Sequence, residues 1–337
     1  MIQSAKKKIV LYQPKQVDDS LGVQSSKDML PLELLTIAAF PLKDGYDVRI
    51  VDGSLYNGTE GHERFAQEAE GAMLVATTAI LGYMVTDSWR AMQAVKQKHP
   101  KVPAVIGGWF ASVRPDLMLE TGLYEAVVIG QGELIFRDLV RAIDAGESLD
   151  DMEGIAILRD GQVIKNPRRA VAGWDDIPGV PWHLLDPTPY RAHQMRANSA
   201  GDVLRMPTPP WIGPRKPYFG ITYFSSYGCP EPCGFCCSPE ISMRRWKCMP
   251  ADRMLDDIEE LHDRWGFDVI RFHDANFGVM QKRVREFSEG LLNRDLRIGW
   301  NAFIETRSIL KYKPATLDML ADSGMYIAEI GAEAGMD

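Results

Sequence analysis

All five cysteines of this 337-residue chain lie between Cys229 and Cys248. Three of them, Cys229, Cys233 and Cys236, have the spacing C-x3-C-x2-C. A disulfide framework would spread its cysteines along the chain and would belong to a secreted protein. Three thiolates this close can bind three corners of a [4Fe-4S] cube, which leaves the fourth iron open to a substrate or cofactor. The spacing therefore predicts an iron–sulfur cluster.

A structural zinc site is the alternative for the same cysteines. Zinc prefers four closed ligands, and Cys237, Cys248 or His262 would have to supply the fourth. The loop follows a predicted strand at Phe219–Phe224 and contains glycine and proline, which let the backbone turn tightly. These features favour the cluster and leave Cys237 and Cys248 as small packed residues.

The composition predicts a globular protein of about two domains, with 45% hydrophobic and 25% charged residues. No segment approaches the ~18 consecutive apolar residues that a membrane span needs. The apolar run after Lys6–Lys8 is too short for a signal peptide, so we expect a cytoplasmic protein. The formal net charge of −8 argues against a nucleic-acid partner, because such binding depends first on neutralising phosphates.

Apolar strand-like runs alternate with helical patterns through residues 1–150. The expected strands are Ile9–Tyr12, Asp47–Asp52, Met73–Thr78, Pro103–Gly108 and Glu125–Gly130. The expected helices lie near Leu32–Leu42, Glu63–Glu70, Val85–Lys98, Pro115–Glu120 and Ile135–Ala145. Strands with little charge are typical of a parallel sheet covered on both faces. The first domain is therefore predicted to be an α/β doubly wound, flavodoxin- or Rossmann-like fold.

Residues 151–217 are expected to connect two domains. A hairpin is predicted from Ile155–Leu158 and Gln162–Lys165, which flank the turn sequence Asp160-Gly161. Nine prolines then follow between Ile177 and Pro217. Because proline breaks helices and cannot donate to a sheet, this stretch is predicted to be an irregular linker.

A second series of strands and helices occupies residues 218–337. The expected strands are Phe219–Phe224, Asp268–Phe272, Arg297–Phe303 and Tyr326–Ile330. The expected helices are Ala251–Trp265, Lys282–Asn293 and Ala315–Asp322. This order predicts the first four strands of a partial, TIM-like (β/α) barrel.

The cysteine loop resembles that of the radical S-adenosylmethionine (SAM) superfamily, which also places an aromatic residue, here Phe235, before the third cysteine. In that family SAM chelates the open iron and is cleaved reductively to a 5′-deoxyadenosyl radical. The resemblance implies a SAM site that includes Phe235, Asp274, Arg307 and Glu333, with Glu333 on the ribose. It also implies an external electron donor of the flavodoxin or ferredoxin type. From the residues alone, Asp274 is as well explained as a helix cap or turn residue.

The first domain resembles the cobalamin-binding domains that precede some radical SAM barrels. The resemblance rests on segment 31–35 and on residues that follow predicted strands, namely Asp52, Thr77, Thr78, Gly107, Gly108, Gly130, Gly132 and Glu133. Gln131 stands where the family usually has Glu. A flat corrin needs a broad crevice at the carboxyl ends of strands, where glycines allow close approach and hydroxyls can bond its amide side chains. A flavodoxin-like domain with another cofactor, or none, is the alternative.

Many cobalamin proteins ligate cobalt through the histidine of an Asp-x-His-x-x-Gly motif. None of the six histidines here has Asp two residues before it. We therefore expect cobalamin to bind without a histidine on cobalt, as the resemblance also implies.

The two resemblances together predict a cobalamin-dependent radical SAM enzyme that methylates an unactivated carbon of a small-molecule substrate. A cyclase or rearrangement enzyme with the same cofactors is one alternative, and a non-catalytic module that binds cobalamin and a cluster is another. A methylthiolating tRNA enzyme is disfavoured, because the chain is acidic and its first domain has no cysteine. Neither the substrate nor a catalytic side chain is identified by the sequence.

The family's partial barrel has six strands, whereas four are recognised here. We therefore expect Tyr326–Ile330 to form an exposed edge strand, a setting that favours self-association. An incomplete barrel would also admit water to the SAM site, so this chain is expected to cleave SAM slowly or not at all.

The cluster assignment predicts the iron content of cysteine variants. After anaerobic reconstitution with iron and sulfide, the protein should carry about four irons per chain. Cys229→Ala, Cys233→Ala and Cys236→Ala should each abolish the cluster, as measured by iron analysis and visible absorption. Cys237→Ala and Cys248→Ala are the controls and should keep it; loss of the cluster in either control contradicts the assignment.

Overall fold

The computed structural model describes residues 7–25, 27, 29–196, 202–203, 208–212 and 216–331. The chain is an α/β protein with two compact units, each built around its own parallel sheet. The first unit comprises the described residues of 1–25, 31–186 and 232–244. The second comprises those of 26–30, 187–231 and 245–337.

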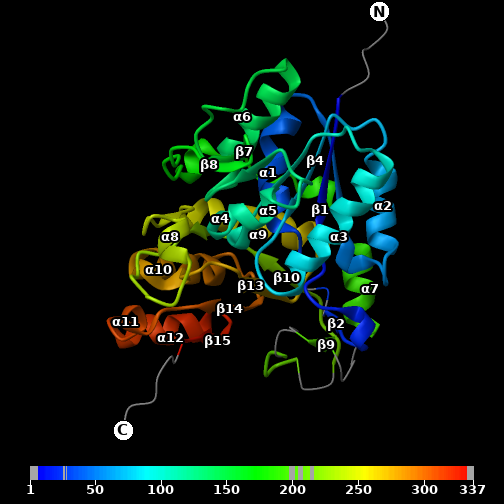
Figure 1. Cartoon of the computed structure of the whole chain (residues 1–337). Coiled ribbons are helices and arrows are strands. Elements are labelled where there is room, and N and C mark those ends of the chain that lie inside the picture. Colours follow the sequence, from blue (N-terminus) through cyan, green and yellow to red (C-terminus); the bar gives the residue numbers. More distant parts are fainter. Residues whose placement is uncertain are drawn as a thin grey trace, which may run out of the picture. The chain divides into compact units, whose positions relative to one another are not determined.

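The sheet of the first unit has the strand order β3-β1-β4-β5-β6-β7-β8. Its strands are β1 (Lys8–Gln13), β3 (Asp47–Asp52), β4 (Leu74–Thr78), β5 (Ala104–Gly107), β6 (Ala126–Val128), β7 (Ile155–Arg159) and β8 (Gln162–Lys165). The first five are parallel to one another, and the last two are antiparallel. The predicted doubly wound fold is confirmed (Figure 1).

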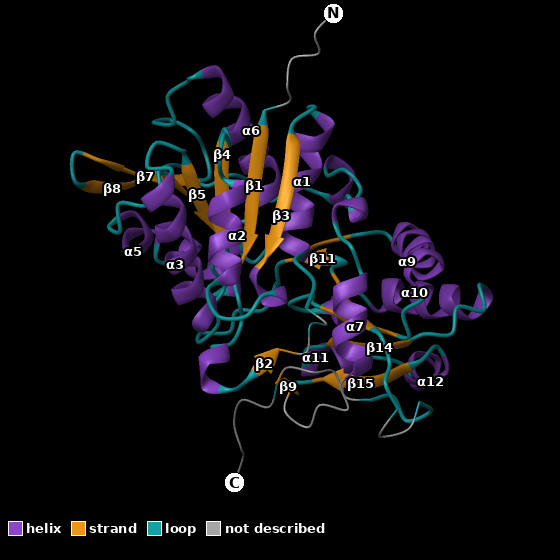
Figure 2. Ribbon diagram, turned by 90° about the vertical axis from the view of Figure 1, so that its right-hand side faces the viewer, coloured by secondary structure: helices purple, strands orange, loops and turns teal. Residues whose placement is uncertain are grey.

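Both faces of this sheet are buried, because alternate residues of β1 enter two separate cores. Ile9 and Leu11 pack with α1 (Leu32–Lys43) and α6 (Gly132–Ala145). Val10 and Tyr12 pack with α2 (Glu60–Glu68), α3 (Tyr83–Lys98) and α5 (Pro115–Leu119). Figure 2 shows β3, β1 and β4 side by side, with α1 on one side and α2 and α3 on the other. Full burial explains why these strands carry so little charge.

The predicted hairpin is confirmed and extends the first sheet. Asp160 and Gly161 both have positive φ angles, of 52° and 76°, as a two-residue turn between twisted strands requires. β7 pairs with β6, so the hairpin belongs to the first unit and is not part of a linker.

The second unit contains a parallel four-stranded sheet with the order β10-β13-β14-β15. The strands are β10 (Gly220–Tyr223), β13 (Val269–Phe272), β14 (Gly299–Phe303) and β15 (Met325–Glu329), and the helices between them are α9 (Ala251–Trp265), α10 (Gln281–Asn293) and α12 (Pro314–Asp322). A cluster of Phe272, Phe277, Phe287 and Trp300, with ring centroids 4.6–5.9 Å apart, fills one side of the sheet. Within the described residues β15 pairs only with β14, as an edge strand does.

The prediction of an irregular segment between the domains is wrong at α7 (Thr188–Arg196). Pro189 falls in the first turn of this helix, where the missing N–H has no helical partner to lose. Gln194 then fixes α7 to β10, because its side chain accepts from Gly220 N at 2.7 Å and donates to Gly220 O at 3.0 Å.

Several short elements were not predicted. They are β2 (Gln24–Ser25), β9 (Asp202–Val203), α4 (Trp109–Val113), β11 (Ser226–Tyr227), α8 (Ser238–Ile241), β12 (Lys247–Cys248) and α11 (Thr306–Ile309). β11 and β12 pair antiparallel and close the base of the cysteine loop. No helix in the described part of the chain is long and apolar enough to cross a membrane.

Candidate functional site

The residues predicted for cobalamin binding lie at the carboxyl ends of the parallel strands of the first sheet. This side of the sheet is here called the carboxyl edge. Thr77 and Thr78 end β4, Gly107 ends β5, Gly130 follows β6, and Gly132 and Glu133 begin α6. The structure brings them to a common edge because β4, β5 and β6 are adjacent and parallel. Crevices at this edge are the usual binding place for cofactors in open α/β sheets.

Position 108 requires glycine because of its backbone conformation and the atoms around it. Its φ and ψ of 95° and 176° are accessible essentially to glycine alone. A Cβ there would lie 2.5 Å from the carbonyl oxygen of Ala79 and 2.7 Å from Oγ1 of Thr78. Contact with the end of β4 and the residue after it therefore already requires glycine, and the close approach of a corrin to Gly108 stays a prediction.

Buried polar side chains that the sequence analysis did not select surround the same edge. Gln13, at the end of β1, donates from Nε2 to Oε1 of Glu33 at 3.1 Å. The Thr36 hydroxyl donates to the carbonyl oxygen of Glu33 at 3.0 Å and lies near the carboxyl group of Glu133. Burial raises the pKa of both Glu33 and Glu133. Isolated polar residues in the otherwise apolar segments 9–13 and 31–40 could have identified these side chains from the sequence.

This edge fits a ligand that brings hydrogen-bond donors. Gln13 Oε1 and Glu133 Oε2 are buried and have no hydrogen-bond partner among the described residues. Buried acceptors without a donor are destabilising by about 1–3 kcal/mol each. A corrin, whose rim carries amide groups, would supply such donors.

Two histidines of the first unit are held by other groups. His62 Nε2 lies 2.8 Å from Asp87 Oδ1, and Tyr12 donates to Oδ2 of the same aspartate at 2.8 Å. His99 Nε2 lies 2.9 Å from the carbonyl oxygen of Ala66. Both histidines thus connect α2, α3 and β1. The absence of a histidine ligand on cobalt stays a prediction.

The cysteine loop begins after β11. Cys236 N donates to Cys233 O at 3.2 Å, and Ser238 N donates to Cys236 Sγ at 3.4 Å. All five cysteines are free, Cys233 is exposed, and Cys229 and Cys236 are partly exposed. Chemistry and exposure fit a cluster, but no three Cys, His, Asp or Glu side chains in the described ranges are grouped closely enough to hold a metal ion. The three ligands therefore stay a prediction.

The second half of the cysteine loop belongs to the first unit. Residues 232–244 group with that unit, and α8 packs against α4, the helix that follows Gly108. Arg168 reinforces this packing by donating to Ile241 O at 2.6 Å. Two of the predicted cluster ligands, Cys233 and Cys236, thus share a unit with the predicted cobalamin edge.

Asp274 holds the chain just before the loop. It accepts from Ser225 N at 2.7 Å and from the hydroxyls of Ser225 and Ser226 at 2.6 Å each. Burial raises its pKa, although nearby Arg283 lowers it. Arg283 also donates to Ser225 O at 3.1 Å. In the structure Asp274 is therefore a buried residue that fixes the turn leading into the cysteine motif.

The remaining residues predicted for SAM are exposed or not described. The Phe235 side chain is 71% exposed. Arg307 is also exposed and forms an ion pair of 3.7 Å with Glu231. Glu333 lies outside the described residues.

A polar row crosses the second sheet on the side opposite to the aromatic cluster. Thr222, Arg271 and Asn301 are register partners on β10, β13 and β14. Arg271 pairs with Glu329 of β15 at 3.2 Å, and Asn301 Oδ1 is buried without a partner in the described chain. Polar side chains on this face were missed because the strands were recognised by their apolar residues.

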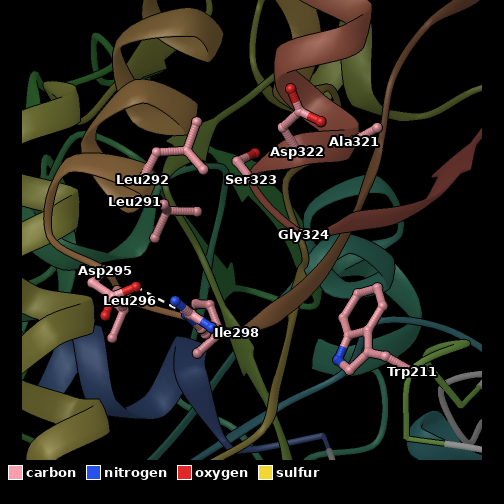
Figure 3. A pocket seen from close by; sticks show the side chains of 11 residues that line it. Trp211, Leu291, Leu292, Asp295, Leu296, Ile298, Ala321, Asp322, Ser323 and Gly324 are labelled. Carbon is pink, nitrogen blue, oxygen red and sulfur yellow. Dashed lines mark hydrogen bonds and ion pairs between the residues drawn. The ribbon is translucent and has the colours of Figure 1, made fainter.

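One cavity of the second unit lies away from these residues. It measures about 500 Å³ and is lined by the ends of α10 and α12, by Ile298 and Gly324 before β14 and β15, and by Trp211 (Figure 3). These positions mark the amino ends of the strands. In (β/α) barrels the chemistry gathers at the carboxyl ends, so this cavity is not the candidate active site.

Comparison with known proteins identifies the first unit. Residues 20–140 match the B12 binding domain family. An uncharacterized methyltransferase of Pyrococcus horikoshii is 28% identical over 274 residues, which cover 81% of this chain and 54% of the relative. Anaerobic magnesium-protoporphyrin IX monomethyl ester cyclase of Rubrivivax gelatinosus is 24% identical over 319 residues, which cover 93% and 53%.

Solved structures share the fold of the chain. The cobalamin-dependent SAM radical enzyme OxsB, with aqua-cobalamin and SAM bound, matches with a TM-score of 0.75 and 18% identity over 98% of this chain and 44% of that one. The radical SAM methyltransferase TsrM of Kitasatospora setae, with cobalamin and a [4Fe-4S] cluster bound, matches with a TM-score of 0.71 and 17% identity over 97% and 59%.

Residues 20–140 therefore form a domain of the B12 binding family, and the whole chain is similar to cobalamin-dependent radical SAM enzymes in sequence and in fold. Its relatives are methyltransferases and cyclases. The chain spans about half the length of the curated relatives it matches.

The crowding at Gly108 can be tested against a matched glycine. Gly82 also has a positive φ, of 59°, but no atom lies within 4 Å of the position that a Cβ would occupy there. Gly108→Ala should therefore lower the free energy of unfolding by about 1–3 kcal/mol more than Gly82→Ala does. Urea unfolding followed by circular dichroism measures the difference, and equal effects of the two substitutions would refute the crowding.

Proposed function

We propose that this chain is the cobalamin- and cluster-binding part of a radical SAM enzyme that methylates an unactivated carbon of a small molecule. The observation that carries the proposal is the B12 binding domain followed, in one chain, by a strand that leads into C-x3-C-x2-C. A low-identity methyltransferase relative supports methylation.

When bound, the cluster with SAM would supply a carbon-centred radical, and cobalamin would supply the methyl group. Cys229, Cys233 and Cys236 would hold the cluster and leave one iron for SAM. Asp274 and Arg283 would fix the backbone of Ser225 ahead of these cysteines. The protein's part is mainly orientation, because a misplacement of about 1 Å costs roughly 100-fold in rate.

The carboxyl edge of the first sheet would hold the corrin. Thr77, Thr78 and Glu133 would contact it, and the glycines would shape the turns between strands and helices. An external donor of the flavodoxin or ferredoxin type would reduce the cluster. A nucleic-acid partner is not proposed, since the chain has a net charge of −8.

Cyclisation or rearrangement without methyl transfer is the second candidate function. A specific observation favours it, because a ring-forming cyclase matches 93% of this chain. Both candidates require the same radical, and they differ in whether the methyl group of SAM is used.

The two candidates give different products from SAM. The protein, reconstituted with iron, sulfide and cobalamin, is incubated with SAM and dithionite, and the nucleosides are separated by chromatography. Methyl transfer should yield both 5′-deoxyadenosine and cobalamin-dependent S-adenosylhomocysteine. Cyclisation predicts 5′-deoxyadenosine alone.

Cys233→Ala should abolish 5′-deoxyadenosine, and Cys237→Ala should retain it. If the protein binds neither cobalamin nor a cluster that Cys233→Ala removes, the proposal fails.

A further inference from the structure

Gln13 is a polar residue at the end of a buried apolar row. Ile9, Leu11 and Gln13 lie on the same face of β1, and the first two are in the core with α1 and α6. The Gln13 side chain is only 5% exposed. Its amide nitrogen is used by Glu33, whereas Oε1 has no partner in the described chain. The edge of the sheet thus carries a buried acceptor that lacks a donor.

Two carboxyl groups belong to the same region: Glu33 hydrogen-bonds to the Gln13 amide, and Glu133 lies near Thr36. Glu33 and Glu133 occupy the second positions of α1 and α6. Thr36 lies between them: its hydroxyl donates to the Glu33 carbonyl oxygen at 3.0 Å and lies near the Glu133 carboxyl group. Oε2 of Glu133 is the second buried acceptor without a donor in the described chain. Burial raises the pKa of both carboxyl groups, as expected where water does not solvate them fully.

The group formed by Gln13, Glu33, Thr36 and Glu133, here called the acceptor cluster, has a chemical preference. Its unused atoms are both acceptors, so a ligand that offers N–H groups removes their desolvation penalty. A ligand carboxylate offers no N–H donor, so both buried acceptors would stay unpaired beside it. The acceptor cluster therefore favours a primary amide over a carboxylate.

We propose that the acceptor cluster recognises carboxamide groups on the rim of the corrin and selects the fully amidated corrinoid over one with a free carboxylate. The inference rests on the proposed binding of cobalamin. It adds a specificity to that binding, because the same site would reject a corrinoid whose amide facing Gln13 and Glu133 is hydrolysed.

The test compares cobalamin with its monocarboxylic acids, in each of which one side-chain amide is hydrolysed to a carboxylate. Equilibrium binding to the full chain is followed by visible absorption. At least one monocarboxylic isomer should bind about tenfold more weakly than cobalamin, a difference of about 1.4 kcal/mol. The isomers altered elsewhere on the rim should bind as cobalamin does.

Glu133→Gln localises the effect, because it replaces one acceptor oxygen by an NH₂ donor. The variant should bind cobalamin more weakly than the wild-type chain does. The difference in affinity between cobalamin and the weakly bound monocarboxylic acid should become smaller. Glu70→Gln is the matched control: Glu70 is exposed and lies at the opposite edge of the sheet, where Lys8 Nζ donates to its carbonyl oxygen. The control should leave all affinities unchanged.

The outcomes separate the inference from the function on which it rests. If cobalamin and every monocarboxylic isomer bind equally well, the selection is wrong and cobalamin binding stands. If the wild-type chain binds none of them, both fail. The wild-type comparison decides the matter even if Glu133→Gln does not fold.

Discussion

Burial of both faces of the parallel first sheet is the constraint on which the rest of the structure depends. With helices packed on each side, the central strands β1, β4, β5 and β6 carry their polar groups at their ends. Because β1, β3, β4, β5 and β6 all run in the same direction, their carboxyl ends meet at one edge. That edge collects Gln13, the threonines of β4 and the start of α6, and it is the natural place for a large cofactor.

The cysteine loop is positioned by a different kind of interaction. Its start depends on a buried polar network, in which the carboxylate of Asp274 and the guanidinium of Arg283 hold Ser225 and Ser226. Its second half packs on the first unit through α8 and α4. Hydrogen bonds of this buried, charged kind are strong and directional, so they can fix a loop that has little regular structure.

The sequence predicted the regular elements well for a simple reason. Apolar runs and helical periodicity mark α9 and β3 to the residue, because burial on a defined face determines both patterns. α7 was missed because its proline was interpreted as a helix breaker, although it lies in the first turn. The pairing of β11 with β12 joins residues about 20 positions apart through two-residue strands, which no local pattern reveals.

The candidate site was predictable where its residues are marked by their spacing in the sequence or by their position at the end of a strand. Cysteine spacing predicts a cluster without any structure, and strand ends predict the cofactor edge. Gln13, Glu33 and Thr36 escaped notice because their role depends on a contact between β1 and α1 that the sequence does not specify. The crowding at Gly108 was not predictable for a similar reason, since the atoms that crowd it come from the end of β4 and the residue after it.

The central claim is that the first unit binds cobalamin at its carboxyl edge without an axial nitrogen from the protein. The most direct measurement is the electron paramagnetic resonance spectrum of Co(II) cobalamin bound to the purified chain under anaerobic conditions. The account predicts saturable binding and a spectrum without nitrogen hyperfine splitting, because His62 and His99 are held by Asp87 and Ala66 and the cofactor's own base is displaced. Failure to bind, or splitting from an axial nitrogen, would contradict it.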